Sequence, residues 1–259
     1  MEKKYKLTEE TIKVYDKTLY RIEALRNFSD VKKGDKGGYI EKEENLSQNS
    51  NCWVDGNAIV YGNARVYGNA LVCGNASIYG DARVFGDARV FGNAEVYNNA
   101  IVCGNAQVCG YARIYGQAQV RDDAEVYGDA VVCDEAKVYG DAWVYGTAEV
   151  YGNARIYGNA EIRGDAEIAS NSDYIVFKNW WSSGRYFTWT KGNDMWKVGC
   201  FYGTGEQLIE KAYKDSEISG REYKKVVGYV NSIKANEYNH VRKNIKERLL
   251  SKMRKLFGK

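Results

Sequence analysis

The chain has 259 residues, of which 44% are hydrophobic and 27% charged, and its formal net charge is +3. No apolar run approaches the roughly 18 residues of a membrane-spanning helix, and no signal peptide is visible, so we expect a cytoplasmic protein without a membrane partner. The six cysteines include no CxxC pair and His240 is the only histidine. The usual zinc-ligand patterns are therefore excluded, and neither a metal site nor a cofactor is predicted.

Residues 1–53 are expected to form a cap. The segments "TIKVY" and "LYRIEAL" flank "DKT", which predicts a hairpin, and "KKGDKGG" predicts a loop. A cap is needed because the end of a repeat structure exposes apolar core and unpaired strand edges. Ile40, Leu46 and Trp53 are expected to close the first turn.

Residues 54–170 carry a six-residue repeat. Val or Ile stands at position 54 and at every sixth residue up to 168, and Ala follows four residues after each of the first 19, from Ala58 to Ala166. A period of six fits strands and no helix, so Val and Ala point to the same inner side. Gly and Asn or Asp stand between them as corners, where local Asx hydrogen bonds are expected. The pattern predicts a coil of three sides and 18 residues, with about six to seven coils in all.

The tandem pattern [Val/Ile]-x-x-x-Ala-x over residues 54–169 resembles the hexapeptide-repeat superfamily, which is best known for trimeric acyltransferases. This resemblance implies a single-stranded left-handed parallel β-helix. The two flanks resemble uncharacterised bacterial and prophage β-helix proteins that are labelled as transferases; they read "VKKGDKGGYIEKEENLSQNSNCWV" and "WKVGCFYGTGEQLIEKAYKDSEISGREYKKVVGYV". Acyltransferases of the superfamily generally use a histidine near a subunit interface and a loop that breaks the coils. The repeat has neither, so no catalytic residue is carried over and we expect a protein that is not an enzyme.

Sorting the outward residues by 18 separates three faces. The first face ends in an aromatic strip that predicts self-association as a dimer or trimer; its residues are Phe91, Tyr127, Trp143 and Tyr145. The second face carries a tyrosine column that is expected to stabilise neighbouring coils by cross-strand pairing; its members are Tyr61, Tyr79, Tyr97, Tyr115 and Tyr151. The third face is basic and aromatic, which suits an anion or nucleotide or an acidic face of a second subunit; its cations are Arg65, Arg83, Arg121, Lys137 and Arg155.

Residues 171–259 are expected to form a basic α+β domain. A small meander is predicted over 174–202, and "TGEQ" at 204–207 matches a capping box that starts a helix. This helix is expected to run to about Ser219 and to break at Gly220, with a second helix to about Ala235 and a third over 240–259. The third carries an apolar stripe of Val241, Ile245, Leu249, Met253 and Leu256. Aromatic and basic residues of the meander predict a partner-binding surface; these are Trp180, Trp181, Arg185, Phe187, Trp189 and Trp196.

The mainly β fold is thus expected in three domains, over residues 1–53, 54–170 and 171–259. These carry net charges of +1, −7 and +9, and a basic end favours an acidic partner or an opposite charge within an oligomer. We expect a non-enzymatic oligomeric scaffold of phage or prophage origin that binds a host protein, for example as an inhibitor of a defence component. The alternatives are an acyl-CoA-dependent acyltransferase and a nucleotide or nucleic-acid binder that uses the third face.

Overall fold

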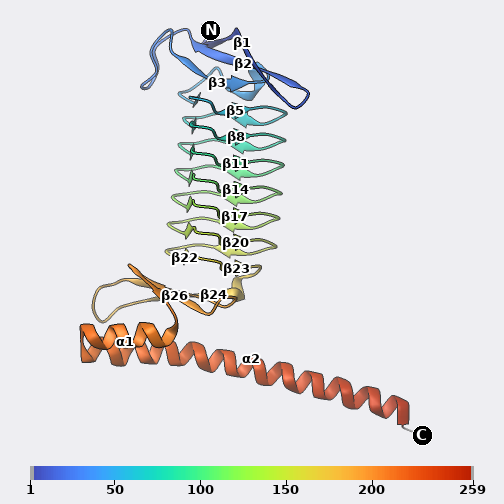
Figure 1. Ribbon diagram of the computed structural model, residues 1–259, viewed down its shortest axis with the longest axis vertical. Coiled ribbons are helices and arrows are strands. Elements are labelled where there is room, and N and C mark those ends of the chain that lie inside the picture. The colour runs from blue at the N-terminus through green and yellow to red at the C-terminus, as the bar shows by residue number, and fades with distance from the viewer. Residues whose placement is uncertain (1–2, 258–259) are drawn as a thin grey trace. The chain divides into compact units, whose positions relative to one another are not determined.

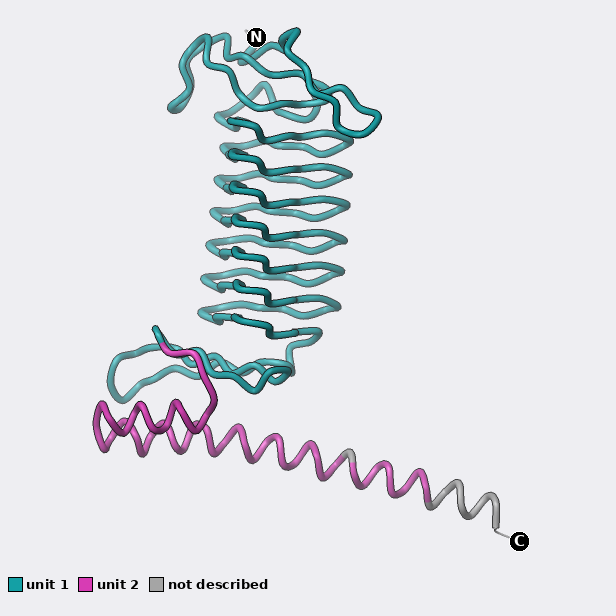
Figure 2. The backbone as a smooth tube through the Cα atoms, in the orientation of Figure 1, with its two compact units in different colours: residues 1–200 teal, residues 201–259 magenta. Residues whose placement is uncertain are grey.

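The computed structural model describes residues 3–257, except for the side chains of Val241 and of residues 250–257. The chain divides into two compact units, Met1–Cys200 and Phe201–Lys259 (Figure 2). The first unit is a β-solenoid of about seven turns with antiparallel strands at its N-terminal end and a small sheet after its last turn (Figure 1). The second unit is mainly helical. The fold class predicted from the sequence is confirmed.

Three parallel sheets form the sides of the solenoid, and successive turns add one short strand to each sheet. The first sheet contains β4 (Trp53–Val54), β7 (Leu71–Val72), β10 (Arg89–Val90), β13 (Gln107–Val108), β16 (Glu125–Val126), β19 (Trp143–Val144) and β22 (Glu161–Ile162). The second contains β5 (Ile59–Val60), β8 (Ser77–Ile78), β11 (Glu95–Val96), β14 (Arg113–Ile114), β17 (Val131–Val132), β20 (Glu149–Val150) and β23 (Glu167–Ile168). The third contains β6 (Arg65–Val66), β9 (Arg83–Val84), β12 (Ile101–Val102), β15 (Gln119–Val120), β18 (Lys137–Val138) and β21 (Arg155–Ile156).

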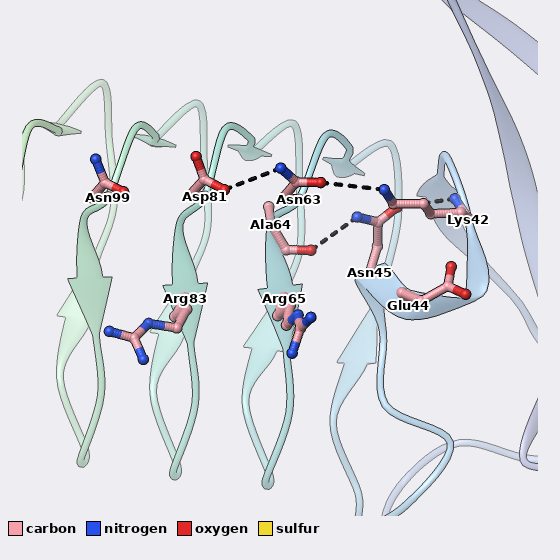
Figure 3. Close-up of a pocket in the computed structure, with 9 residues that line it drawn as sticks. All are labelled: Lys42, Glu44, Asn45, Asn63, Ala64, Arg65, Asp81, Arg83 and Asn99. Atoms are coloured by element: carbon pink, nitrogen blue, oxygen red, sulfur yellow. Dashed lines mark hydrogen bonds between the residues drawn. The ribbon is translucent and has the colours of Figure 1, made fainter.

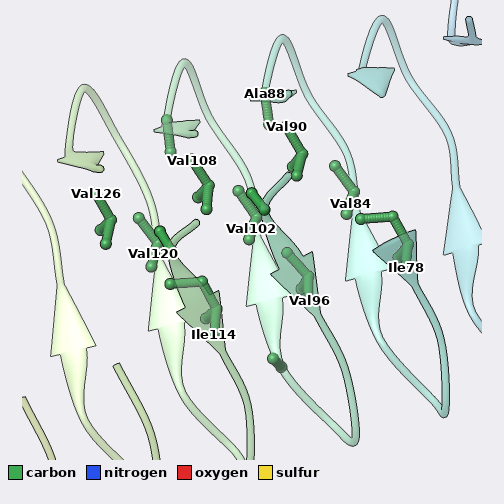
Figure 4. Close-up of a cluster of buried hydrophobic side chains, with 14 of the residues drawn as sticks. Ile78, Val84, Ala88, Val90, Val96, Val102, Val108, Ile114, Val120 and Val126 are labelled. Atoms are coloured by element: carbon green, nitrogen blue, oxygen red, sulfur yellow. The ribbon is translucent and has the colours of Figure 1, made fainter. Parts of the chain in front are cut away.

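The repeat residues of the coils form one continuous core. Every Val or Ile of the six-residue series is at most 1% exposed, and Ala58 through Ala166 are 0% exposed. Figure 4 shows these side chains lying inside successive turns. Burying one Val or Ile side chain contributes about 1.5–3 kcal/mol, and Ala keeps the interior narrow. The predicted inward placement of both series is confirmed.

Glycine is required at most corners of the coils for two reasons. Its φ there lies between +60° and +77°, a region that residues with a Cβ rarely adopt. A Cβ at Gly68 would also lie only 2.9 Å from the backbone nitrogen of Gly86 in the next turn. At three corners this conformation is taken by Asn98, Asp122 and Asp134 instead, the residue types that tolerate it best.

The corner asparagines bond between turns, which differs from the local Asx hydrogen bonds expected from the sequence. Asn69 Nδ2 donates to Asp87 Oδ1 at 3.0 Å, and Asn105 Nδ2 donates to Asp123 Oδ1 at 2.9 Å. Asn57, Asn63 and Asn75 likewise donate to the corner residue 18 positions later. The 18-residue register places these side chains above one another, so each amide finds its acceptor in the following turn.

The cap begins with the predicted hairpin. β1 (Tyr5–Val14) pairs antiparallel with β2 (Lys17–Ala24), and β2 pairs with β3 (Lys36–Ile40), which leads into the short helix η1 (Glu43–Asn45). The loop expected over "KKGDKGG" is wrong in its second half, because β3 starts at Lys36. Gly37 and Gly38 allow this strand to approach the first turn, since a Cβ on either would lie 2.4 Å from a coil carbonyl oxygen.

The closing residues of the cap are placed as predicted. Ile40 and Leu46 are 0% exposed and Trp53 is 4% exposed. The rings of Tyr5 and Phe28 pack edge-on against Trp53, at centroid distances of 6.4 and 5.4 Å. The apolar end of the solenoid is therefore covered by cap side chains.

The last turn is followed by η2 (Asn171–Asp173) and the predicted meander of β24 (Tyr174–Lys178), β25 (Tyr186–Thr190) and β26 (Met195–Val198), which pair antiparallel. The meander contacts the end of the first sheet. The Glu161 amide donates to Thr188 Oγ1 at 3.0 Å, and Lys197 Nζ lies 2.9 Å from a Glu161 carboxylate oxygen. The first of these bonds satisfies a strand amide that no further turn can reach, and the second is an ion pair between side chains.

The second unit starts with β27 (Phe201–Gly203), followed by α1 (Gly205–Asp215) and α2 (Glu217–Phe257). The predicted capping box is confirmed, because the Thr204 side chain accepts from the Gln207 amide and Gln207 Oε1 accepts from the Thr204 amide. The predicted break at Gly220 is wrong, and the two later helices are one. A Cβ at Gly220 would lie 2.2 Å from the Tyr213 ring, so this glycine allows α1 and α2 to pack closely. The chain turns instead at Ser216, whose hydroxyl accepts from the Ser219 amide.

The apolar stripe expected on the third helix lies partly outside the described residues. Ile245 and Leu249 are exposed on α2, at 53% and 56%. The side chains of Val241, Met253 and Leu256 are not among those described. No helix in the described part of the chain has the length and apolar character needed to cross a membrane.

Candidate functional site

The third sheet presents an outward surface that we call the basic face. Between the buried valines and isoleucines its outward residues are Arg65, Tyr67, Arg83, Phe85, Ile101, Cys103, Gln119, Arg121, Lys137, Tyr139, Arg155 and Tyr157. All five cations predicted as a possible anion or nucleotide site belong to this set, and no acidic residue does. The structure thus gathers the predicted residues on one face.

Like charges lie opposite one another twice on the basic face. Arg65 is paired in register with Arg83, and Lys137 with Arg155. Neighbouring strands are about 4.8 Å apart, and like charges placed directly opposite destabilise a sheet. Within the described residues, none of these four cations has a salt-bridge partner. The face therefore carries a repulsion that a bound anion would relieve.

Planar side chains run beside these cations. The rings of Tyr67 and Phe85 stack at 4.7 Å with an interplanar angle of 5°, and those of Tyr139 and Tyr157 stack at 5.5 Å. The Arg121 guanidinium lies 4.3 Å from the centroid of Tyr139 and also bonds the carboxylate of Asp122 at 3.0 Å. Arginine charge together with aromatic rings is the combination that binds phosphates and stacks bases.

A hollow of about 560 Å³ lies where the basic face meets the cap. Figure 3 shows Arg65 and Arg83 on neighbouring strands, with Lys42 and Asn45 reaching from the cap. The lining residues are Lys42, Glu44, Asn45, Asn63, Ala64, Arg65, Asp81, Arg83 and Asn99. Two carboxylates, of Glu44 and Asp81, share the hollow with three cations, so its net charge favours an anion.

Hydrogen bonds from the cap hold the wall of this hollow in place. The Asn45 side chain is buried and its Nδ2 donates to the carbonyl oxygens of Ala64 at 2.9 Å and Gly62 at 3.1 Å. Lys42 Nζ donates to Asn63 Oδ1 at 3.4 Å. A second hollow of about 420 Å³ adjoins the first and is lined by Glu44, Ser47, Arg65, Val66 and Tyr67. Arg65 therefore stands between two hollows and is accessible from both.

Sequence reasoning missed Lys42 and Asn45. Both precede Val54, where the Val and Ala series begins, and so lie outside the repeat as it was recognised. The 18-residue period gives a usable signal in hindsight, because Asn45 stands 18 residues before the corner residue Asn63.

The aromatic strip predicted to mediate self-association lies on the first sheet. Tyr127 and Tyr145 stack at 4.8 Å, and Trp143 packs edge-on against Tyr127 at 6.5 Å. Phe91, Tyr127 and Tyr145 are half-buried, while Trp143 is 40% exposed. Beside Trp143 is a hollow of about 570 Å³ that four carboxylates line together with Arg185 and Tyr186 of the meander. The structure thus brings the strip and the meander edge close to one another.

The six residues predicted to bind a partner are divided by the structure. Phe187, Trp189 and Trp196 are at most 2% exposed and form the core of the meander, so the many aromatic residues mostly serve packing. Trp181 is half-buried, Arg185 is exposed and Trp180 is 82% exposed. Only the last two could reach a partner freely.

Four of the five predicted members of the tyrosine column on the second sheet stack as predicted, whereas Cys133 separates the fifth, Tyr151, from Tyr115. The ring pairs Tyr61–Tyr79, Tyr79–Tyr97 and Tyr97–Tyr115 stack at 5.1, 4.8 and 4.9 Å. Burial raises the pKa of Tyr61 to about 12, and the hydrogen bond with Cys133, with burial, raises the pKa of Tyr115 to about 12. Such pairs stabilise adjacent turns by about 0.2–1 kcal/mol each.

The remaining residues with metal-binding or nucleophilic side chains lie outside the strands of the basic face or are single thiols. No group of three or more His, Cys, Asp or Glu there is arranged to hold a metal ion. His240 lies exposed in α2. All six cysteines are free thiols.

The comparisons with known proteins bear on the repeat. Residues 64–80 match the family model described as the YdcK β-solenoid repeat. No curated protein matches the chain. The chain is therefore similar to a known family of β-solenoid repeats over one stretch of its coils, and this similarity agrees with the fold.

Proposed function

We propose that the protein is a non-enzymatic binding scaffold whose basic face holds a phosphate-bearing ligand, a nucleotide or a single strand of nucleic acid. The observation that carries this proposal is the pairing of Arg65 with Arg83 and of Lys137 with Arg155 on a face whose outward strand positions hold no acidic residue. Phosphate accepts charge-assisted hydrogen bonds from guanidinium groups, often two at a time. One phosphate between two opposed arginines would turn their repulsion into attraction.

The scaffold is suited to binding because its turns hold the cations at fixed intervals. Successive outward residues of the face are about 4.8 Å apart along the solenoid, and the buried Val and Ala series beneath them prevents rearrangement. A ligand thus meets a charge pattern that is organised before it arrives, which lowers the cost of binding. Nothing in this arrangement requires a general base or a nucleophile.

The experiment compares two double variants of equal charge. Arg65→Ala with Arg83→Ala removes one opposed pair, whereas Arg89→Ala with Arg113→Ala removes exposed arginines from the first and second sheets. Fluorescence anisotropy measures the affinity for a labelled oligothymidylate of about 15 nucleotides, within the site sizes of single-strand binders. We expect the first variant to lose about tenfold in affinity and its log–log salt slope to fall by about 0.7, the value for one phosphate that is no longer neutralised.

The control variant is expected to keep both affinity and salt slope. Equal losses from the two variants would mean that only overall charge matters, and the assignment to the basic face would be wrong. Binding of acetyl-CoA in calorimetry, abolished by a single substitution in the coils, would favour the acyltransferase alternative.

As a second candidate function, the loop between β24 and β25 binds a protein partner, which we interpret as a host protein. Trp180 is 82% exposed at the tip of this loop. The loop is held by Asn179, which is fully buried, donates to Ser182 Oγ at 2.8 Å and accepts from the amides of Trp181 and Ser182. A tryptophan presented on an ordered loop is a typical binding hot spot. A partner retained by the unmodified protein and by Tyr111→Ala, but lost with Trp180→Ala, would support this candidate.

A further inference from the structure

The planar side chains of the basic face form a column that is interrupted at one position. The residues at 67, 85, 103, 121, 139 and 157 occupy equivalent places in six successive turns, 18 residues apart. Four of them are aromatic and one is Arg121. The remaining residue is Cys103, whose backbone follows the same ladder, with its amide donating to Val120 O at 3.0 Å. The interruption is therefore in the side chain and not in the scaffold.

The column is regular on both sides of Cys103. Tyr67 and Phe85 stack at 4.7 Å before it, and Arg121 lies 4.3 Å from the Tyr139 ring after it. Turns are about 4.8 Å apart, so Phe85 and Arg121 are separated by about twice that distance. A planar ring at the height of Cys103 would continue the column at the spacing of its existing members. One face of that ring would stack on the Phe85 ring, and the other face would lie against the Arg121 side chain.

The charges around this position suit a nucleobase with its phosphate. Burial raises the pKa of the Cys103 thiol, so the thiol is neutral, and Arg121, Asp122 and Arg83 all lie close enough to act on that pKa. Cysteine also interrupts the columns of the other two sheets, where the cations are fewer: Arg113 acts on Cys133 beside Asp134 and Glu149, and Glu125 alone acts on Cys109. The Cys133 thiol is in addition hydrogen-bonded to Tyr115. Among the four coil cysteines that interrupt a column, only Cys103 has two arginines acting on its thiol; Cys73 and Cys133 have one each and Cys109 has none.

We propose that a nucleobase of the ligand occupies the missing ring position above Cys103, stacked on Phe85, while Arg83 and Arg121 hold the adjoining phosphates. This inference rests on the proposed function and adds to it the part of the ligand that is recognised, a planar base in a single strand. Duplex ends and bare phosphate chains cannot supply an unpaired base at this position.

The test fills the missing ring position. Cys103→Tyr restores an aromatic side chain to the column, and Cys133→Tyr does the same on the second sheet as the matched control. The probes are a labelled oligothymidylate of about 15 nucleotides and an abasic strand with the same number of phosphates. We expect the unmodified protein and the Cys133→Tyr variant to bind the thymidylate about tenfold more tightly than the abasic strand, as one lost base stack implies. The Cys103→Tyr variant is expected to bind both strands equally.

A second variant guards against a folding defect. Phe85→Leu removes the stacking surface without filling the position, and Phe91→Leu is its control on the first sheet; thermal melting verifies the fold of each. We expect Phe85→Leu, and not Phe91→Leu, to reduce the preference for thymidylate.

The outcomes separate this inference from the proposed function. If the unmodified protein binds both strands equally, the base position is wrong and phosphate binding by the face stands. A preference for thymidylate that survives Cys103→Tyr likewise overturns the inference. If neither strand binds, the proposed function fails, and the inference fails with it. Inorganic polyphosphate that displaces thymidylate as well as unlabelled thymidylate does would assign the face to phosphate alone.

Discussion

The coils and the N-terminal cap satisfy their buried backbone by different means. Within the coils each strand amide donates to a carbonyl of the next turn, as Ile59 N does to Ala76 O at 2.9 Å, and the core holds only Val, Ile and Ala. The cap donates partly from its backbone, as Tyr39 N does to Ala58 O at 2.9 Å, and elsewhere uses polar side chains for the same purpose. Asn45 Nδ2 donates to Gly62 O and Ala64 O, and the Tyr5 hydroxyl donates to Leu46 O at 2.7 Å.

The difference shows what ending a repeat requires. The amides of each turn donate to carbonyl groups of the next turn. No turn precedes the first one, so its carbonyl groups would be buried without donors if the cap supplied none. An unsatisfied buried acceptor costs about 1–3 kcal/mol. In the cap even a lysine serves as such a donor: the Lys4 side chain is fully buried and its Nζ donates to Cys52 O at 2.7 Å. Burial lowers the pKa of this lysine.

The largest expected effect comes from the interior of the coils. Ala106 is fully buried, and Ala106→Leu forces extra volume into a cross-section that neighbouring turns cannot widen. We expect the free energy of unfolding to fall by about 3 kcal/mol or more, measured by denaturant unfolding. Gln107→Leu, an outward substitution in the adjacent position, is the control and should change it by less than about 0.5 kcal/mol. Equal effects of the two would contradict the inward placement of alanine.

The next largest effect is expected in the cap. Asn45→Leu keeps the side-chain size but removes the donor to Gly62 O and Ala64 O, which should cost about 2 kcal/mol. Asn63→Leu serves as the control, because Asn63 is an exposed corner residue whose amide bonds to Asp81 across water-accessible surface. An Asn45 variant as stable as the Asn63 variant would mean that water or backbone rearrangement replaces the cap donor.

The coils and the cap also differ in how much of their structure the sequence predicts. The six-residue period predicted the core, the three faces and the cations of the basic face, because one local rule repeats from Val54 to Ile168. The cap obeys no such rule, and the partners of Lys4 and Asn45 lie 48 and 19 residues away in the chain. The Lys4 contact leaves no pattern in a single sequence, and the Asn45 contact leaves only the spacing of 18 residues between Asn45 and Asn63.

Composition was misleading where one residue type can serve two purposes. Gly220 suggested a helix break, yet it allows the Tyr213 ring to pack against α2. The aromatic residues of the meander suggested a recognition surface, yet Phe187, Trp189 and Trp196 are needed to fill its core. A small sheet lacks the repeated neighbours of a coil and must bury large side chains instead.

A smaller effect is expected at alkaline pH, where the tyrosine column of the coils is tested. The pKa values of Tyr61 and Tyr115 are about 12 in the folded protein, above the ordinary value near 10. The unfolded chain therefore releases its protons first, and stability that is fully present below pH 10 should be lost as the pH rises through about 12. Denaturant unfolding at a series of pH values checks this loss of stability. Tyrosinate absorbance of the folded protein should appear at a higher pH than that of the unfolded chain.

The matched variant for this prediction is Tyr79→Phe. It keeps the ring between Tyr61 and Tyr97 but removes a hydroxyl whose pKa burial also raises. The decline of stability with pH should become shallower than in the unmodified protein. An unchanged decline would place its origin outside the column, for example in the buried Tyr5 of the cap, whose pKa is raised as well.

The smallest effect on stability is expected at the far end of the coils, where Trp143 tests how much the meander covers. Trp143 lies in register between Glu125 and Glu161. A neutral substitution, Trp143→Gln, is therefore used, because a carboxylate at this position would repel both glutamates.

We propose that the strip of Phe91, Tyr127, Trp143 and Tyr145 is covered by a second copy of the chain. The variant should then lose oligomer mass in light scattering while its melting temperature measured on the dissociated protein changes little, because an exposed side chain contributes less than about 0.5 kcal/mol to the fold. Tyr111→Glu, at an exposed corner, is the control and should keep the mass. An unchanged mass with a lowered melting temperature would assign the strip to the meander, whose Arg185 and Tyr186 line the hollow beside Trp143, and the coils would then end as they begin, under a cover built by their own chain.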